Sequence, residues 1–503
     1  MSVNGVAEKS QQRDEGARAG AGSRSGATAG LLAAGSPWRL RAGEDIADLR
    51  HSPLTVLVSQ APLRLPRQAS VVEAEKALHA AGRGAAVLDG DPVSVVVVND
   101  LRRRLLGGDV APHTPVRAAA RGLPAIAGDM PVGRALSWMA GHRSGLVGVR
   151  RNDELVGLVG FEDLAQRQAG VDLDLLNHVA APERRALLQR YGRALGAAVD
   201  TLYSCGLDPV RIAAILAGLS DALSVRLLRQ AERDLGGPPC PYSWLALGSQ
   251  GRSEPALLSD QDNALVYRDE STENAAWFAA LAGQVVDGLE AAGYPRCPGG
   301  FMATNWCRSL SEWQHVVRNW VHNPESQAVL ETNLFLDFRS LHGGLSVAPL
   351  DDLLQSGANR EVFLAQIARS ATKFRPPLGL FGRLKARNGT IDVKHGGITG
   401  IVLIARLYGL AAHSSARSTL DRLAAASGTT LSAQSAVALG DGLHFLSGLR
   451  LREQIRRQRL GEAPGNLVPL EQLSDAERRR LRNGLRMVSV VQRATALKYH
   501  VNA

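Results

Sequence analysis

The spacing of apolar side chains predicts two copies of one α/β unit between residues 54 and 168. Each copy combines a segment of helical periodicity with two short apolar runs that fit strands. These segments are 71–81, 85–88 and 93–98 in the first copy, and 132–139, 145–149 and 155–159 in the second. In both copies an acidic residue followed by Leu opens a further helix. A tandem repeat of this kind implies two units packed against each other.

The pattern then changes twice along the chain. Residues 175–236 show apolar positions at helical spacing on both sides of Asp208-Pro209, where Asp208 would cap the second helix and Pro209 would begin it. After residue 237 two short apolar runs predict buried strands, and residues 350–500 are helical again. Residues 1–36 have almost no large apolar side chain, which predicts a disordered tail.

The strand predicted at Trp244–Leu247 ends in the turn Gly248-Ser249-Gln250-Gly251-Arg252. Its two glycines allow a sharp bend and a close approach of the backbone to a ligand. Such a turn exposes backbone N–H groups and a hydroxyl, which suit a polyphosphate. On its own, this signal is weak.

A pair of acids follows this turn and leads into the next predicted strand, Ala264–Tyr267. Asp260 and Asp262 are two residues apart, so in an extended backbone both project from the same face. Two carboxylates that close repel each other unless a cation lies between them. Mg²⁺ takes oxygen ligands and also coordinates substrate phosphates. The alternative is an Asp/Asn-rich turn with its own side-chain hydrogen bonds.

Composition narrows the class of protein. Hydrophobic residues make up 45% and charged residues 21% of the 503 residues, as in globular domains. The net charge of +10 favours anionic partners, but the arginines are spread along the chain, which favours a solvated basic surface over a nucleic-acid site. The four cysteines form no CxxC pair, as expected of reduced thiols. Without a membrane-length apolar run or a secretory signal, we expect a cytoplasmic protein with no membrane partner.

The segment 244–267 resembles the core of the nucleotidyltransferase superfamily, which has a DNA polymerase β-like fold. It is most similar to the branch that contains the PII-protein uridylyltransferase and the glutamine synthetase adenylyltransferase. The tandem repeat resembles a pair of CBS motifs, the adenosine-nucleotide-sensing module. The whole arrangement resembles the bacterial signal-transduction nucleotidyltransferases that join such modules to this core.

This resemblance implies an α+β multidomain fold with four parts after the tail. They are a CBS-like α/β tandem repeat (54–168), a helical connector (175–236), a polymerase β-like nucleotidyltransferase core with a mixed sheet (237–345), and a C-terminal helical substrate-binding bundle (350–500). In the core, Gly248 and Ser249 would contact the β- and γ-phosphates of a nucleotide. Arg252 would help to neutralise phosphate charge, and Glu254 would brace the loop.

The resemblance also implies a metal site. Asp260 and Asp262 would bind Mg²⁺ or Mn²⁺, and the fold usually adds a third carboxylate from a later strand. The best match is Asp337, in the apolar run 333–339, as metal ligand or as base for the attacking hydroxyl. The alternative makes Asp337 a buried partner of Arg339.

Three further residues match family positions with alternatives left open. Lys394 would belong to the nucleotide site or form a structural ion pair with Asp392. In the CBS-like repeat, Asp100 and Asp163 match acids that hold ribose or phosphate in that family, although the usual threonines are replaced by Val97 and Gly160. Both acids could instead be helix caps.

The resulting hypothesis is a nucleotidyltransferase that moves a nucleoside monophosphate from a nucleoside triphosphate to a hydroxyl on a protein acceptor, in a signalling context. A small-molecule acceptor is one alternative, and a non-catalytic adenine-nucleotide sensor or scaffold is another. Nucleic-acid polymerisation or tailing rests only on fold analogy and net charge. The CBS-like pair also suggests a homodimer.

Overall fold

The computed structural model describes residues 51–503, except 82, 91, 107–109, 143, 170–175, 177–178, 258, 324–325, 380–381 and 502–503. The chain divides into two units, Met1–Asp45 and Ile46–Ala503. The predicted tail, residues 1–36, lies outside the described residues, which all belong to the second unit.

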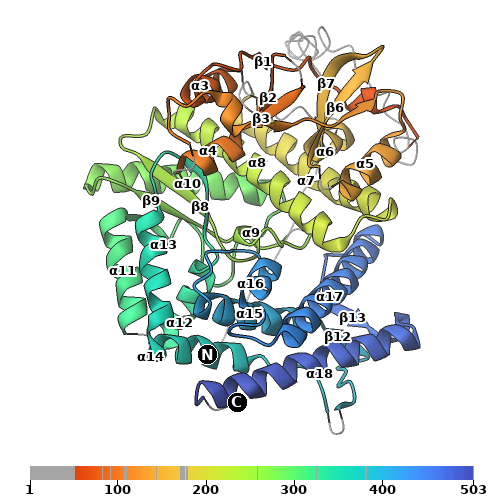
Figure 1. Cartoon of the computed structure of the whole chain (residues 1–503), viewed down its shortest axis with the longest axis vertical. Coiled ribbons are helices and arrows are strands. Elements are labelled where there is room, and N and C mark those ends of the chain that lie inside the picture. Colours follow the sequence, from red (N-terminus) through yellow and green to blue (C-terminus); the bar gives the residue numbers. More distant parts are fainter. Residues whose placement is uncertain are drawn as a thin grey trace, which may run out of the picture. The chain divides into compact units, whose positions relative to one another are not determined.

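The predicted tandem repeat is confirmed, and both copies use the same strand pairing (Figure 1). In each copy a parallel strand pair is followed by an antiparallel one: β1–β2 then β2–β3, and β5–β6 then β6–β7. The first copy comprises β1 (Arg64–Leu65), α3 (Val71–Ala80), β2 (Ala85–Leu88), β3 (Ser94–Val97), α4 (Val98–Leu106) and β4 (Arg121–Gly122). The second comprises β5 (Ala125–Ala127), α5 (Val132–Gly141), β6 (Leu146–Arg151), β7 (Glu154–Gly160) and α6 (Phe161–Ala169).

The connector consists of the two long helices α7 (Ala181–Ser204) and α8 (Pro209–Leu235). Asp208 caps α8 as predicted, since its side chain accepts hydrogen bonds from the backbone N–H groups of Val210 and Arg211 at 2.9 and 3.3 Å. The apolar stripes of both helices join one hydrophobic cluster with the second repeat and one face of the core sheet. The first repeat has a cluster of its own. The connector therefore shares its core with the sheet that carries the candidate site.

The core sheet has the order β10-β9-β8-β11 and is mixed, as predicted. Strand β10 pairs parallel with β9, whereas β9–β8 and β8–β11 are antiparallel. Alternate residues of β8 and β9 enter two different apolar clusters, so both faces of the sheet are covered. The core elements are β8 (Tyr242–Ala246), α9 (Gly248–Gly251), β9 (Asn263–Tyr267), α10 (Thr272–Ala291), β10 (Cys307–Ser309), α11 (Leu310–His322), α12 (Ser326–Phe335) and β11 (Arg339–Gly343).

The expectation that Asp337 belongs to a later strand of the core is wrong. The apolar run 333–339 does not form a single strand, because its first residues end helix α12 at Phe335. Asp337 lies in the turn between α12 and β11. Short apolar runs fit a buried helix and a buried strand equally well, so periodicity could not separate the two.

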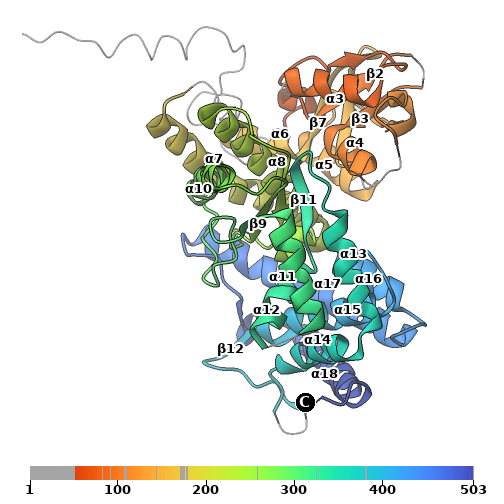
Figure 2. The ribbon, with the colours of Figure 1, turned by 90° about the vertical axis from the view of Figure 1, so that its left-hand side faces the viewer.

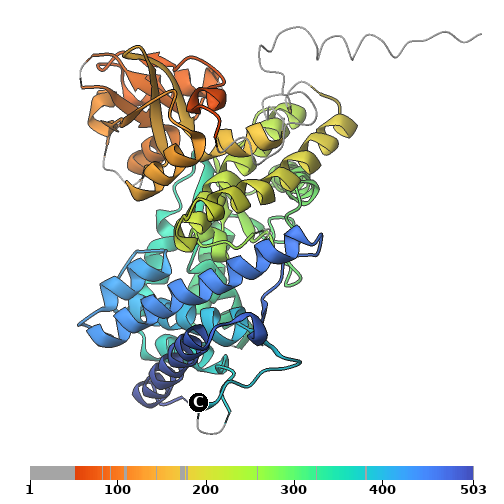
Figure 3. The ribbon, with the colours of Figure 1, turned by 90° about the vertical axis from the view of Figure 1, so that its right-hand side faces the viewer.

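The C-terminal region is helical, as predicted, and covers the other face of the core sheet. Helix α15 packs against α14 and α16 (Figure 2). It also packs against the π-helical turn η6. Helix α17 runs against α8, and α18 packs on α17 (Figure 3). The elements are α13 (Ala348–Ser356), α14 (Glu361–Lys373), β12 (Thr390–Asp392), η6 (Lys394–Ile398), α15 (Thr399–Ala411), α16 (Thr419–Ala426), α17 (Ala433–Arg459), β13 (Leu467–Pro469) and α18 (Asp475–Lys498). In the part of the chain described, no helix combines the length and the apolar character needed to cross a bilayer.

Candidate active site

The turn after β8 brings the backbone very close to two other elements. Gly248 has a φ of +53°, a conformation that favours glycine. A Cβ atom at this position would lie 2.6 Å from Oδ2 of Asp262. A Cβ atom at Gly251 would overlap the backbone carbonyl of Asp337. Both glycines are therefore required by the space around the turn, and Gly248 by its dihedral angle as well.

Asp260 and Asp262 both line the cavity beside this turn. The residue between them, Gln261, is buried and points away, donating its amide to the carbonyl oxygens of Val286 and Tyr294, each at 3.2 Å. The alternation expected of an extended backbone thus holds here and turns both carboxylates to the same side. Asp260 is exposed, whereas Asp262 is partly buried.

The environment of Asp262 favours its neutral form. Burial raises the pKa of Asp262 to about 6, and the nearby carboxylate of Asp260 contributes to this increase. The thiol of Cys297, together with the cations Lys394 and Arg252, acts in the opposite direction. A cation placed at this carboxylate would relieve the repulsion and favour ionisation.

The cavity has a volume of about 290 Å³, near the lower end of ligand pockets. It combines a polar part with an apolar wall contributed by α8, η6, α15 and α17. The polar lining includes most of the residues singled out from the sequence, namely Gly248, Ser249, Arg252, Glu254, Asp260, Asp262 and Lys394. Arg450 and Gln454 of α17 and Arg406 of α15 also belong to this polar lining. Asp337, Asp100 and Asp163 are not among the lining residues.

Two cations that line the cavity, Lys394 and Arg450, are partly buried. Burial lowers the pKa of Lys394, and the neighbouring Arg450 lowers it further, while Asp260 and Asp262 raise it. Burial also lowers the pKa of Arg450 to about 10. The Nε atom of Arg450 donates a hydrogen bond of 2.7 Å to Asn466, which fixes one edge of the guanidinium. An anion between these two cations would offset both the desolvation and their mutual repulsion.

Asp392, the alternative partner of Lys394, forms hydrogen bonds with His395. The carboxylate of Asp392 accepts hydrogen bonds from the backbone N–H and the Nδ1 atom of His395, both at 2.9 Å. Asp392 therefore closes the first turn of η6, which holds Lys394 at the start of that turn.

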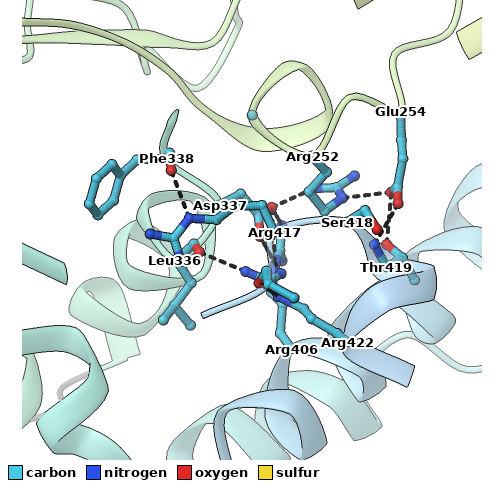
Figure 4. Close-up of polar contacts among 12 residues, drawn as sticks. Arg252, Glu254, Leu336, Asp337, Phe338, Arg406, Arg417, Ser418, Thr419 and Arg422 are labelled. Carbon is cyan, nitrogen blue, oxygen red and sulfur yellow. Dashed lines mark hydrogen bonds and ion pairs between the residues drawn. The ribbon is translucent and has the colours of Figure 1, made fainter. Parts of the chain in front are cut away.

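The contacts of Asp337 correct the expectation of a metal ligand (Figure 4). Its carboxylate is completely buried and binds three guanidinium groups: Arg252 at 2.5 Å, Arg422 at 2.6 Å, and Arg406 through Nε at 3.0 Å and through a second nitrogen. Although burial favours the neutral acid, the charges of Arg406, Arg252 and Arg422 hold the pKa of Asp337 well below its ordinary value. Both oxygens are occupied, so neither is available to a metal ion or to a substrate proton.

The alternative partner proposed for Asp337 is also corrected. Arg339 binds Asp221 of α8 instead, with NH1 at 2.7 Å from Oδ2 and NH2 at 3.1 Å from Oδ1. Because Asp337 lies in a turn, its side chain points toward α15 and α16 rather than along the sheet (Figure 4).

Glu254 links the glycine turn to the C-terminal helices. Its Oε2 atom accepts hydrogen bonds from Arg252 Nε at 2.9 Å and from the hydroxyl of Thr419 at 2.7 Å. Its Oε1 atom accepts the backbone N–H of Thr419 at 2.6 Å, at the start of α16 (Figure 4). Arg252 is thus held on both sides, by Glu254 and by Asp337.

The two acids of the CBS-like repeat lie in the first turns of α4 and α6. Asp163 accepts the backbone N–H of Gly160 at 2.7 Å, which is a capping contact, and burial raises its pKa to about 7. Asp100 lies 3.8 Å from Arg121. The contact of Asp163 fits the capping alternative.

Sequence reasoning missed several residues that shape the site. Arg422 and Asp221 belong to no sequence motif. Arg422 binds Asp337, which lies 85 residues earlier in the chain, and Asp221 binds Arg339, which lies 118 residues later. The one available signal for Asp221 is an acid on a helix face that is otherwise apolar.

Two family models match this chain. "Putative nucleotidyltransferase DUF294" matches residues 193–327, and "Putative nucleotidyltransferase substrate binding domain" matches residues 361–499. Together they span more than half of the 503 residues and include the glycine turn, both carboxylates and Lys394. The chain belongs to this nucleotidyltransferase family. A comparison with curated proteins finds no match.

Solved structures similar to this chain include CBS-domain proteins. One is a CBS domain protein from Pyrobaculum aerophilum in complex with AMP, with 28% identity over 22% of this chain and 89% of that chain, and a TM-score of 0.21. Another is a CBS-domain protein from Agrobacterium tumefaciens, with 22% identity over 22% of this chain and 90% of that chain, and a TM-score of 0.20. An acetoin utilization protein from Vibrio cholerae has 17% identity over 25% of this chain and 97% of that chain, and a TM-score of 0.21.

Proposed function

We propose that this nucleotidyltransferase moves a nucleoside monophosphate from a nucleoside triphosphate to a hydroxyl on a protein acceptor and releases pyrophosphate. The observation that carries the proposal is the convergence of two carboxylates, a glycine–serine turn and two partly buried cations on one cavity. The protein acceptor and the signalling role come from the resemblance to the uridylyl- and adenylyltransferase branch. A small-molecule acceptor is the second candidate, since the cavity is small.

The donor atoms at Asp260 and Asp262 fit a magnesium or manganese ion. Both side chains offer carboxylate oxygens, the ligands that these ions prefer. Among the described residues, no group of three or more His, Cys, Asp or Glu side chains gathers as a metal site. The protein would therefore supply two ligands, and the remaining oxygens would come from the triphosphate and water. A metal ion bound there would neutralise phosphate charge during the transfer.

The other polar residues have separate roles in this proposal. Lys394 and Arg450 would bind the triphosphate, because an anion compensates the charges that burial has deprived of water. Ser249 and the backbone of the turn would hold the phosphate oxygens, and Gly248 would let the turn approach Asp262.

Arg252 would add positive charge while Glu254 and Asp337 keep its guanidinium in place. Positioning and electrostatics would provide most of the rate enhancement.

Pyrophosphate release tests the proposal directly. The protein is incubated with each of the four ribonucleoside triphosphates, with Mg²⁺ or Mn²⁺ and a cell extract, and labelled nucleotide is traced to a protein band or to a metabolite. Asp260→Asn and Asp262→Asn should abolish turnover while the thermal unfolding transition stays intact. The matched control is Asp269→Asn, because Asp269 is an exposed acid just after β9 and pairs with Arg268. If either Asp260→Asn or Asp262→Asn kept wild-type turnover, the assignment of these two acids as metal ligands would be refuted.

A further inference from the structure

Asp221 is a buried acid in the middle of the connector helix α8, and its contacts reach the glycine turn of the core. Its residue exposure is 6%. Its Oδ1 atom accepts a hydrogen bond of 2.8 Å from the side-chain amide of Gln250. The same amide donates to the backbone carbonyl of Ala217 at 3.0 Å, one helical turn earlier. Gln250 is therefore fixed to α8 by two hydrogen bonds.

The ion pair of Asp221 with Arg339 holds the backbone of the same turn. The guanidinium of Arg339 binds both carboxylate oxygens of Asp221, and its NH2 group also donates to the carbonyl oxygen of Gln250 at 3.1 Å. The Nε atom lies 3.4 Å from the carbonyl oxygen of Gly251. Asp221 thus orients Arg339, and Arg339 holds two consecutive carbonyl groups of the turn.

The position of this turn matters because Gly248 has almost no free space beside Asp262. A small displacement of the turn would change the distance between Ser249 and the two carboxylates. Gly248 and Ser249 directly precede Gln250, so a hold on Gln250 restricts them as well. Reacting groups commonly need placement within about 0.5 Å.

Helix α8 also carries a second acid, which contacts the core sheet away from the glycine turn. Near its end, Glu232 accepts hydrogen bonds from the hydroxyl of Tyr242 on β8 at 2.6 Å and is 3.0 Å from Nε2 of His342 on β11. These contacts bind α8 to the core sheet without touching the glycine turn. Glu232 therefore offers a matched acid on the same helix.

We propose that Asp221 is a positioning residue for nucleotidyl transfer, which holds the glycine–serine turn at the distance from Asp260 and Asp262 that the triphosphate requires. This inference rests on the proposed function, since it assigns the turn to the phosphates. Asp221 contacts no substrate in this role and acts through Gln250 and Arg339.

The test compares Asp221→Asn with Glu232→Gln in the full-length protein. The Asp221→Asn substitution keeps the shape of the side chain but removes the charge opposite Arg339. Hydrogen–deuterium exchange of the peptide covering residues 247–254, measured without nucleotide, should increase in Asp221→Asn and stay at the wild-type level in Glu232→Gln. In the pyrophosphate assay, kcat/KM for the triphosphate should fall about 10- to 100-fold in Asp221→Asn alone.

The outcomes separate this inference from the proposed function. Unchanged exchange in Asp221→Asn, or an equal increase in both variants, would overturn the role of Asp221, as would a wild-type kcat/KM. Lack of turnover by the wild-type protein would instead refute the proposed function, while the exchange data still decide whether Asp221 holds the turn. Should Asp221→Asn fail to fold, Gln250→Met removes the amide contact and leaves the ion pair of Asp221 with Arg339 in place. The same increase in exchange is expected, and its absence would contradict the proposal.

Discussion

Replacing Gly248 with alanine perturbs the candidate site at its most crowded point. The new Cβ atom would lie 2.6 Å from Oδ2 of Asp262 and 3.1 Å from Cδ2 of Leu334. Ordinary contact begins at 3.4 Å, so the carboxylate must retreat by about 0.8 Å. The oxygen is at the end of a side chain and can move by rotation. The substitution should therefore displace a catalytic group without disrupting the core.

The structure separates the effect on stability from the effect on catalysis. The left-handed backbone at Gly248 (φ +53°) should cost an alanine about 1–2 kcal/mol of unfolding free energy. A displacement of nearly 1 Å at a reacting group can lower the rate by about 100-fold. We thus expect a modest loss of stability and a fall in kcat of about two orders of magnitude.

Gly461→Ala is the matched control for this prediction. Gly461 also has a left-handed backbone (φ +73°), but its Cβ position meets no atom within 4 Å. Both variants should lose a similar unfolding free energy in denaturant titrations, while only Gly248→Ala should lose pyrophosphate release. If Gly248→Ala kept kcat within about threefold of the wild type, the close approach to Asp262 would not matter for the reaction.

Three further predictions follow from the charged groups. Asp337→Ala should lower the unfolding free energy by about 3–5 kcal/mol in denaturant titrations, because three guanidinium groups lose their buried partner. A variant that is as stable as the wild type but no longer binds the metal ion would restore the assignment of Asp337 as a metal ligand. Lys394→Gln should raise KM for the triphosphate at least tenfold, because a charge-assisted hydrogen bond contributes about 1.5–3 kcal/mol to binding. An unchanged KM would exclude Lys394 from phosphate binding. The raised pKa of Asp163, about 7 against 3.8, means that stability falls as pH rises through this interval. Melting temperatures between about pH 5 and pH 8 should therefore fall less in Asp163→Asn, and parallel curves would contradict this.

The parts of the fold that could be predicted from the sequence depend on local patterns. The helices α3, α5, α7 and α8 and the strands β2, β8 and β9 follow the spacing of apolar residues, a signal that lies within each element itself. The grouping of Gly248 with Asp260 and Asp262 is local as well, since all three lie in the connection between the paired strands β8 and β9. Lys394 joined this group only through the family resemblance, and the fold brings it to the same cavity.

The surroundings of Asp337 could not be predicted, for a physical reason. The residue sits after a short apolar run that fits helix and strand equally, so its direction depended on an element that periodicity left undecided. Its partners Arg406 and Arg422 come from helices 69 and 85 residues later in the chain. A single acid within an apolar segment indicates burial with a partner, but the nature of the partner, a metal ion or an arginine, is fixed only by tertiary packing.

The glycine turn is held from two directions by parts of the chain that lie outside the core sheet. Asp221 of the connector holds Gln250, whereas Thr419 of α16 holds Glu254, and Asp337 joins Arg252 to the C-terminal helices. Each of these contacts is buried or partly buried, where the loss of one partner is costly. The core 237–345 therefore carries the turn and both carboxylates, whereas Asp221, Thr419 and the arginines of α15 and α16 that support the turn come from other parts of the chain. Lys394 and Arg450, which line the same cavity, also come from the C-terminal region. The connector and the C-terminal helices are thus parts of the site itself.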